Sequence, residues 1–477
     1  MKKITFLLLL VSVILTAQNS DRFYATMNIV DARALANDMP SEIEILTTHQ
    51  NEAAVYMTEI AAHALHDRIL VHGPGYIFKA SEEEVMEALL KKPAMRNNRM
   101  PFTITEDAVV NQVLGVVNTQ NIEDHILELE AYGTRFHSTS QGSQASEDLK
   151  TKWEAMAAAY NRTDVSVRLF QHNNTNMPSV IMTIEGAELP EEFVIVGGHL
   201  DSTSFSGSAP GADDDASGIA TITEAARSLF EIGYKPKRTI EIMAYAAEEI
   251  GLVGSAEIAS EYADNNVDVV GVAQFDMTNY NGSVNDIYFI TDFTSALLNS
   301  YLMDLLEHYN ASGEHEITYD TSLCNYGCSD HASWTNEGFL ASFPFEARFS
   351  QHNDNIHTPN DTYAVSGTSE HATKFAKLCA EFLIEAAKTN TVLAVGEATI
   401  ENVFITIDGN SLSYDISASS QSFERIQLFN VLGTKVFDQP IEALKGSWNV
   451  SSLASGVYVA SIAANNGTVV TKKLIKE

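Results

Sequence analysis

The chain contains few cysteines and few basic residues, and it lacks a long apolar run after its first residues. Only three of its 477 residues are cysteine, so at most one disulfide can form within the chain. The chain has 29 lysines and arginines and 63 aspartates and glutamates, so its formal charge is −34. Such a surface repels nucleic acid and anionic lipid. These absences argue against a nucleic-acid partner and against a transmembrane segment.

The sequence also lacks a Gly-x-Ser-x-Gly run. That run places the nucleophile in many serine hydrolases, so this class of enzyme is disfavoured. The chain does have the material for a core, since 45% of its residues are apolar and 19% are charged. This balance is typical of a globular protein rather than a disordered one. A chain of this length is expected to form several folding units.

Residues 1–17 have the features of a secretory signal peptide. Lys2 and Lys3 are followed by an apolar run from Ile4 to Leu15 and then by the small Ala17. Signal peptides have this order of basic, apolar and small residues. A buried N-terminal helix is the alternative. No cysteine follows the run that could carry a lipid anchor, so we expect a secreted or cell-surface protein that is exported through the periplasm.

The three cysteines are Cys324, Cys328 and Cys379. The first two stand four residues apart in a polar stretch with a glycine, and in an exported protein this spacing favours a small-loop disulfide. Zinc thiolates are the alternative, but no further cysteine and histidine set completes such a site nearby. Cys379 lies in an apolar stretch and is expected to be a buried helix residue.

Residues 18–104 form a first segment after the signal. They combine a polar, helix-prone stretch from Ser41 to Leu65, a strand-like Arg68 to Val71 and an acidic helix from Ser81 to Lys92. The segment ends in a basic cluster that consists of Lys91, Lys92, Arg96 and Arg99. Basic linkers are easily cut, so we expect a removable pro-segment that keeps a zymogen inactive. A permanent accessory domain is the alternative.

Residues 105–392 alternate between short apolar strands and amphipathic helices. Phe193 to Val196 and Thr239 to Tyr245 are strand-like runs, and between them Ala216 to Ile232 has apolar residues at helical spacing. This alternation predicts an α/β domain with a mixed, mostly parallel sheet sandwiched by helices. Residues 399–477 instead show short alternating strands with turn signals such as Asp408-Gly-Asn410 and Asn465-Asn-Gly467. They predict a small C-terminal β-sandwich.

Acidic and histidine residues follow the expected strands of the middle segment. In open α/β sheets, ligands bind beyond the carboxyl ends of the strands, so these groups are expected to converge. They are His199, Asp201, the run from Asp213 to Asp215, Glu248, Glu249, Asp276 and His357.

Each of these positions has a simpler explanation when it is taken alone. The run from Asp213 to Asp215 can cap the helix that follows it, Glu248 and Glu249 can lie in a solvated loop, and a histidine after a strand is often structural. Taken together, the carboxylates would repel one another in their apolar surroundings. Bound cations would relieve that repulsion, and carboxylates with imidazoles suit zinc.

The middle segment resembles the co-catalytic two-zinc aminopeptidases of the bacterial leucyl aminopeptidase type. The matching runs occur in the family's order and spacing across nearly all of residues 105–392. They are Gly197-Gly-His-Leu-Asp-Ser202, Ala209 to Gly218, Met243 to Gly251, Phe275 to Tyr280, Cys324 to Trp334 and Ile356-His-Thr358. The resemblance implies a zinc exopeptidase-like fold.

The resemblance also implies roles for the site residues. Two Zn²⁺ ions share Asp214; His199 and Asp276 complete one site, and Glu249 and His357 complete the other. Glu248 would be the general base for the water that the two zinc ions activate. Asp201 would accept the second N–H of His199, and Tyr326 would help to hold the oxyanion. The family also has a cis bond from Asp214 to Asp215.

The resemblance places the pocket for the substrate's first side chain at apolar positions. They are Met277, Ile290, Phe343, Phe345, Phe349 and Ile356, and core packing is the alternative for each of them. The chain departs from the family at His352, where tyrosine is usual, and at Phe343, where methionine is common. A preference for a bulky apolar first residue is expected.

The end of the chain resembles the C-terminal sorting domain of type IX secretion substrates. The stretch from Ser452 to Val459 contains Gly-Val-Tyr, and the stretch from Gly467 to Lys476 is rich in lysine. The resemblance implies the secretion machinery as a partner and places the chain at the cell surface or outside the cell. An ordinary carbohydrate- or protein-binding β-module is the alternative.

These inferences predict a secreted dinuclear zinc aminopeptidase that acts on peptide substrates. Two alternatives stay open. One is a catalytically inactive surface-binding protein that keeps the scaffold. The other is an enzyme like glutaminyl cyclase, which would use the same ligands for a different reaction.

Overall fold

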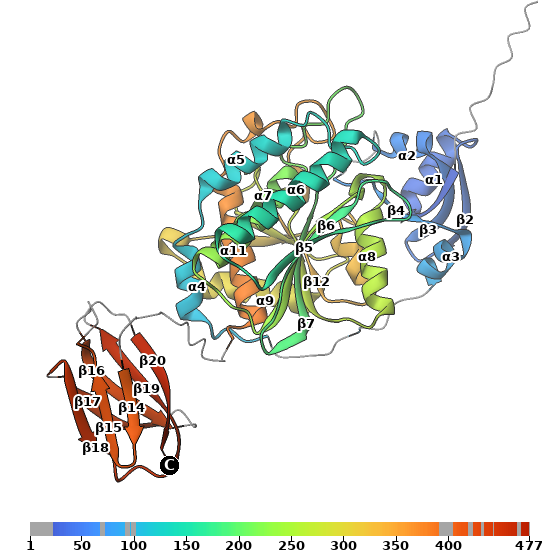
Figure 1. Ribbon diagram of the computed structural model, residues 1–477. Helices are drawn as coiled ribbons and strands as arrows, with labels where there is room; N and C mark the ends of the chain where they lie inside the picture. Colours follow the sequence, from blue (N-terminus) through green and yellow to red (C-terminus); the bar gives the residue numbers. More distant parts are fainter. Residues whose placement is uncertain are drawn as a thin grey trace, which may run out of the picture. The chain divides into compact units, whose positions relative to one another are not determined.

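The computed structural model describes residues 22–66, 72–90, 96, 102–390, 404–417, 423–430, 434–441, 443–464 and 469–476. The chain divides into two compact units, residues 1–390 and 391–477 (Figure 1). Several expected features lie outside the described residues: the signal peptide at 1–17, the strand at 68–71, Lys91, Lys92 and Arg99 of the basic cluster, and the turn at 465–467. None of the helices that the structure does describe is long and apolar enough to cross a membrane.

A six-stranded sheet lies at the centre of the first unit, with the strand order β12-β9-β7-β8-β6-β5. Its strands are β5 (Val165–Phe170), β6 (Ser179–Ile184), β7 (Leu189–His199), β8 (Arg238–Tyr245), β9 (Asp268–Gln274) and β12 (Ala341–Ser342). The four strands β12, β9, β7 and β8 pair in parallel, and β6 and β5 complete the sheet in antiparallel pairs. The predicted mixed, mostly parallel sheet is confirmed.

Helices cover both faces of this sheet, as Figure 1 shows. Val194 and Val196 of β7 pack into one apolar cluster, whereas Ile195 packs into a second cluster, because successive side chains of a strand point to opposite faces. Most of the helices contribute to the first cluster: α4 (Asp107–Leu114), α5 (Thr119–Glu130), α6 (Ser140–Ala159), α7 (Ala216–Glu231), α9 (Ala296–Tyr309) and α11 (Glu370–Ala387). The second cluster includes residues of α8 (Val253–Asp264) and α10 (His331–Asn336).

A smaller three-stranded sheet and several short helices accompany the central sheet. The sheet has the order β11-β10-β13, formed by β10 (Ile287–Ile290), β11 (Tyr319–Ser322) and β13 (Pro344–Phe345). In the described part of the chain, four 3₁₀ helices lie in the loops: η1 (Glu248–Ile250), η2 (Gly313–His315), η3 (Phe349–Gln351) and η4 (Tyr363–Val365).

The N-terminal segment forms its own antiparallel sheet of order β2-β3-β1-β4. Its elements are β1 (Arg22–Asn28), α1 (Ile29–Asp38), β2 (Ile43–His49), β3 (Glu52–Thr58), α2 (Glu59–His66), β4 (Tyr76–Lys79) and α3 (Glu82–Leu90). The acidic helix expected from Ser81 is confirmed as α3. The helix expected over Ser41 to Leu65 is wrong for most of its length. The stretch folds as a hairpin, with Ile43 paired to Met57 and both side chains buried in one core.

The second described unit contains only strands, arranged in two antiparallel sheets. One sheet has the order β14-β15-β18 and the other has the order β17-β16-β19-β20. The strands are β14 (Phe404–Asp408), β15 (Ser411–Asp415), β16 (Phe423–Asn430), β17 (Lys435–Pro440), β18 (Lys445–Asn449), β19 (Gly456–Ala464) and β20 (Val469–Lys476). Leu412 and Ile426, which lie on different sheets, share one buried cluster. This arrangement agrees with the predicted β-sandwich.

Candidate metal centre

The five expected metal ligands gather where β7, β8 and β9 end. His199 is the last residue of β7, Glu249 lies in η1 after β8, and Asp276 lies two residues after β9. Asp214 stands in the loop before α7, and His357 follows η3. The parallel strands therefore deliver ligands from five separate segments to one edge of the sheet, as expected for an open α/β sheet.

Asp214 lies at the middle of this cluster. Its Oδ1 is 2.9 Å from Nε2 of His199, and its Oδ2 is 3.0 Å from Nε2 of His357. On the first side, Asp276 Oδ1 lies 3.5 Å from the same His199 nitrogen. On the second side, Glu249 Oε2 lies 3.0 Å from the His357 nitrogen. One carboxylate thus faces two imidazoles through different oxygens, and each imidazole has a further carboxylate beside it.

The donor set fits a pair of zinc ions. All five side chains are buried. Within the described residues, Asp276 Oδ1 and Glu249 Oε1 accept no hydrogen bond. Burial raises the pKa of Glu249 to about 7, since an ionised carboxylate is costly in the interior. Cations between the carboxylates and imidazoles would remove this cost, and these ligand types are the ones that zinc prefers.

Glu248 and Asp201 lie beside the ligands. Both oxygens of Glu248 are buried and accept no hydrogen bond in the part of the chain that the structure describes, and burial raises its pKa well above the usual range. The two oxygens of Asp201 accept the N–H groups of Glu248 and Glu249, at 3.0 and 3.3 Å. Nδ1 of His199 lies 3.1 Å from the Asp201 carbonyl oxygen and 3.6 Å from its carboxylate. Asp201 thus holds the glutamate pair as well as the imidazole.

Asp215 joins the segments that carry the ligands. Its carboxylate accepts the N–H groups of His199, Gly218 and Met277 at 2.8–3.1 Å, and it caps α7 through Gly218. The peptide bond between Asp214 and Asp215 is cis, as the sequence resemblance implies. Asp215 therefore links the end of β7, the start of α7 and the loop after β9.

The six expected pocket residues form one buried apolar cluster beside the centre. Met277, Ile290, Phe343, Phe345, Phe349 and Ile356 pack together with Cys324, Cys328 and the partly buried Tyr326. Cys324 and Cys328 form a disulfide, which confirms the small-loop pairing, and Cys379 is free and buried in α11. The six residues come from three separate regions of the chain, and the fold brings them together in this one cluster.

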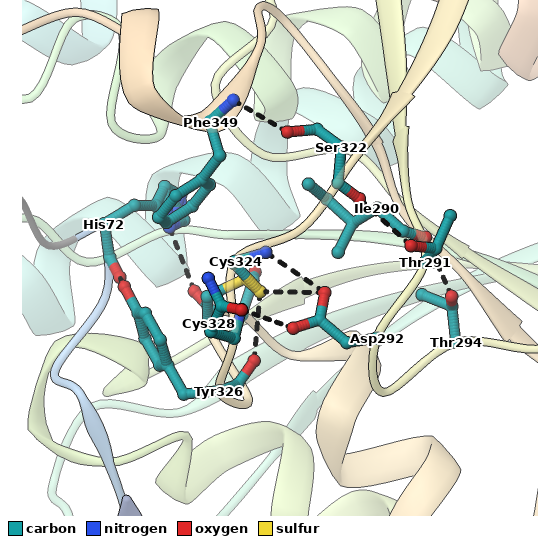
Figure 2. Close-up of a disulfide and its surroundings, with 12 residues drawn as sticks. His72, Ile290, Thr291, Asp292, Thr294, Ser322, Cys324, Tyr326, Cys328 and Phe349 are labelled. Atoms are coloured by element: carbon teal, nitrogen blue, oxygen red, sulfur yellow. Dashed lines mark hydrogen bonds between the residues drawn. A yellow bond between two sulfur atoms is a disulfide. The ribbon is translucent and has the colours of Figure 1, made fainter. Parts of the chain in front are cut away.

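The structure adds one histidine that the sequence reasoning missed. His72, just before β4 of the N-terminal segment, is fully buried, and its Nε2 lies 3.1 Å from Asp276 Oδ2. Figure 2 shows that it is tied to the disulfide loop. Its Nδ1 lies 2.9 Å from the Cys328 carbonyl oxygen, and its own carbonyl oxygen accepts the hydroxyl of Tyr326. Burial lowers the pKa of His72 to about 4. In the sequence, His72 is marked only by the turn-like run His72-Gly-Pro-Gly75, which does not indicate a metal site.

Arg135 is a second residue that the sequence reasoning missed, and it supports the ligand loops. Its guanidinium is fully buried and donates at 2.6–3.1 Å to the carbonyl oxygens of Leu129, Leu200, Pro210 and Gly211. Leu200 directly follows His199, and Gly211 precedes Asp214 by three residues. Arg135 therefore ties together the two loops that carry these ligands.

Arg135→Met is expected to lower the free energy of unfolding by about 3 kcal/mol, because the carbonyls of Leu200 and Pro210 would lose this donor and each buried carbonyl left without a donor costs about 1–3 kcal/mol. Urea unfolding of the zinc-free protein measures the change. Arg33→Met, at an exposed position of α1, is the control and should change the value by less than about 0.5 kcal/mol. Equal stability of the two variants would show that Arg135 does not support the loops.

Comparison with known proteins finds two family matches. Residues 179–383 match the family described as peptidase family M28, and residues 403–477 match the secretion system C-terminal sorting domain. Leucine aminopeptidase 1 of Arthroderma gypseum is 32% identical over 328 residues, which cover 65% of this chain and 85% of that protein.

Solved structures show the same likeness. The crystal structure of the LapA aminopeptidase of Legionella pneumophila is 30% identical to this chain, with a TM-score of 0.67, and the match covers 77% of this chain and 99% of LapA. LapB of the same organism is 25% identical, also with a TM-score of 0.67, over 77% of this chain and 100% of its own.

Proposed function

Because this chain belongs to peptidase family M28 and carries a secretion sorting domain at residues 403–477, we propose that it is an exported aminopeptidase. It releases N-terminal residues from peptides with the help of two zinc ions. His199, Asp214 and Asp276 would hold one ion, and Asp214, Glu249 and His357 would hold the other. The observation that carries this proposal is the position of Asp214, whose two oxygens face two different imidazoles.

Bound zinc ions would polarise the scissile carbonyl and lower the pKa of water at the site. Glu248 acts as general base. Its carboxylate is buried beside the ligands without a hydrogen bond in the described residues, so it is available to take the proton of the attacking water. It then gives that proton to the nitrogen of the departing amine. Asp201 holds the backbone of Glu248 and so positions the base.

Tyr326 donates its hydroxyl to the oxygen that becomes negative during the attack. The Cys324–Cys328 disulfide closes the loop that carries this tyrosine, which limits the positions that its hydroxyl can take. A donor fixed in advance costs little reorganisation when the charge develops. Tyr326 is thus a catalytic residue in this proposal.

The apolar cluster of Met277, Ile290, Phe343, Phe345, Phe349 and Ile356 receives the first side chain of the peptide. Its aromatic walls favour bulky apolar residues, since a hydrophobic pocket gains about 1–3 kcal/mol from each further methylene that it buries. Residues 18–104 are a pro-segment in this proposal, and residues 105–392 are the catalytic domain.

Hydrolysis of a panel of aminoacyl amides tests the proposed function. The zinc-loaded protein is measured before and after limited trypsin treatment, because Lys91, Lys92 and Arg99 are trypsin targets. We expect kcat/KM for leucyl and phenylalanyl amides to exceed that for alanyl amide by about 10- to 200-fold. The ratio does not depend on the active fraction of the protein. No release of free amino acid from any amide would refute the activity, and a preference for alanyl amide would refute the assigned pocket.

The sorting domain indicates that the protein is exported or held at the cell surface. All residues assigned to the site lie in the first unit, residues 1–390. A chain that ends at residue 390 is therefore expected to keep its kcat/KM within about twofold but to stay in the periplasm of a cell with the matching secretion system. Immunoblots of cell fractions measure its location. Normal arrival at the surface would contradict a sorting role for residues 399–477.

A further inference from the structure

The N-terminal segment places the ring of His72 inside the candidate metal centre. The ligand atoms of His72, Asp214 and Asp276 lie within 4.8 Å of one another, as do those of His199, Asp214 and Glu249. His72 lies in the loop before β4 of the N-terminal segment, whereas the five assigned ligands all lie within residues 105–392. The centre thus has one more potential metal ligand than the catalytic domain itself supplies.

The hydrogen bonds of His72 indicate a cation between its ring and Asp276. A carbonyl oxygen can only accept a hydrogen bond, so Nδ1 of His72 carries the proton that it donates to Cys328 at 2.9 Å. Nε2 is then the ring nitrogen that is available to a metal ion. It lies 3.1 Å from the Asp276 carboxylate oxygen and has no hydrogen-bond partner among the described residues. A divalent cation bound by this nitrogen and this oxygen would satisfy both atoms at once.

His72 also occupies the positions assigned to a peptide substrate. The His72 carbonyl accepts the hydroxyl of Tyr326, which is the donor proposed for the substrate's oxyanion. The His72 ring contacts Phe345, with ring centroids 5.3 Å apart, and Phe343, at 6.0 Å. The loop thus blocks both the oxyanion donor and the apolar pocket.

Gly73 allows the loop to reach the proposed base. Its φ is +69°, a backbone conformation that residues with a side chain rarely adopt. A Cβ at this position would lie 2.6 Å from the Cys328 carbonyl oxygen and 3.1 Å from Glu248 Oε1. Only glycine can pass so close to both groups. The next strand, β4, is hydrogen-bonded to the catalytic domain from Phe78 N–H to Gly251 O at 3.0 Å, which keeps the loop in place.

We infer that His72 is a metal ligand supplied by the pro-segment, and that His72 and Gly73 hold the aminopeptidase in a latent state by occupying its metal centre and its substrate pocket. The latency of the aminopeptidase rests on the proposed function. The role of His72 as a metal ligand rests on the geometry alone. Latency ends when the loop leaves the site, which cleavage of the basic linker between the pro-segment and the catalytic domain permits.

The test compares the full chain with His72→Ala and with His49→Ala, a change at an exposed histidine of the N-terminal segment. Before any protease treatment, His72→Ala is expected to raise kcat/KM for leucyl amide by about tenfold or more. In the full chain, kcat/KM is scaled down to the fraction of molecules whose site is open, and the variant should increase that fraction. Cobalt-loaded His72→Ala should show shifted d–d absorption bands, since one nitrogen ligand is lost, and zinc should leave faster to EDTA. His49→Ala should match the unchanged chain in all three measurements.

Gly73→Ala provides a second variant that keeps the imidazole. Its methyl group would collide with the Cys328 carbonyl, so the loop should withdraw and the same three changes should appear. Unchanged activity and spectra in both variants, with circular dichroism showing intact folds, would overturn the inference. A raised activity with an unchanged cobalt spectrum would overturn the ligand role. A changed spectrum in a protein that hydrolyses no amide even after trypsin treatment would support the ligand role and contradict the proposed function.

Discussion

Glu248→Gln is expected to lower kcat by about 10²- to 10⁴-fold, which is the usual contribution of general acid–base catalysis, and to leave both zinc ions bound. Glutamine has nearly the same shape, so the pocket stays intact, but its amide cannot take a proton from water at neutral pH. Glu248 is not among the groups of described residues whose ligand atoms lie within 4.8 Å of one another, whereas Asp214, Glu249 and Asp276 are, so zinc affinity should not change. Single-turnover kinetics and zinc analysis of the trypsin-treated protein measure the two effects.

Glu261→Gln is the matched control for this variant. It makes the same chemical change at an exposed position of α8, the helix that follows Glu248, and should keep the activity of the unchanged protein. A Glu248→Gln enzyme with normal kcat would show that another group takes the proton. A loss of zinc from this variant would show instead that Glu248 is a ligand.

Asp214→Asn is expected to weaken zinc binding at both sites. An amide offers only one acceptor oxygen, and its NH₂ group would point a donor at the second cation. Residues that merely support metal ligands change metal affinity by about 10- to 100-fold when they are mutated, so the loss of a shared ligand should be at least this large. Competition with a zinc chelator measures both affinities, and activity should fall with the zinc content.

Asp264→Asn provides the control for charge, because Asp264 is exposed at the end of α8. It should bind zinc as the unchanged protein does. If Asp214→Asn bound two zinc ions with unchanged affinity, Asp214 would not be a shared ligand. If it lost only one ion, the carboxylate would serve a single site.

The sequence predicts much of the fold and of the site because those features are local. The run from Phe193 to Val196 marks β7, and His199, the last residue of that strand, lies at the ligand-binding edge of any parallel sheet. Asp215 caps α7 as its position before an amphipathic helix suggests. Such residues can be located from their own neighbours in sequence.

The remaining features depend on contacts between distant segments. His72 lies 256 residues from Cys328, to which it is hydrogen-bonded, and nothing in its own neighbourhood indicates that this segment reaches the candidate metal centre. Arg135 looks like an ordinary surface residue in the sequence, yet its four carbonyl acceptors make it a buried support.

The error over Ser41 to Leu65 has a related cause. Alanines and glutamates in this stretch favour a helix, but Ala53, Val55 and Met57 alternate toward one core and pair with β1 and β2. Burial against neighbouring strands outweighs the local preference, because strand propensity depends largely on packing.

A crystal grown with zinc and measured at the zinc absorption edge tests the pairing of metal ions around Asp214 most directly. The account predicts two anomalous peaks on opposite sides of the Asp214 carboxylate, one next to His199 and Asp276 and the other next to His357 and Glu249. A single peak, or peaks away from Asp214, would contradict it.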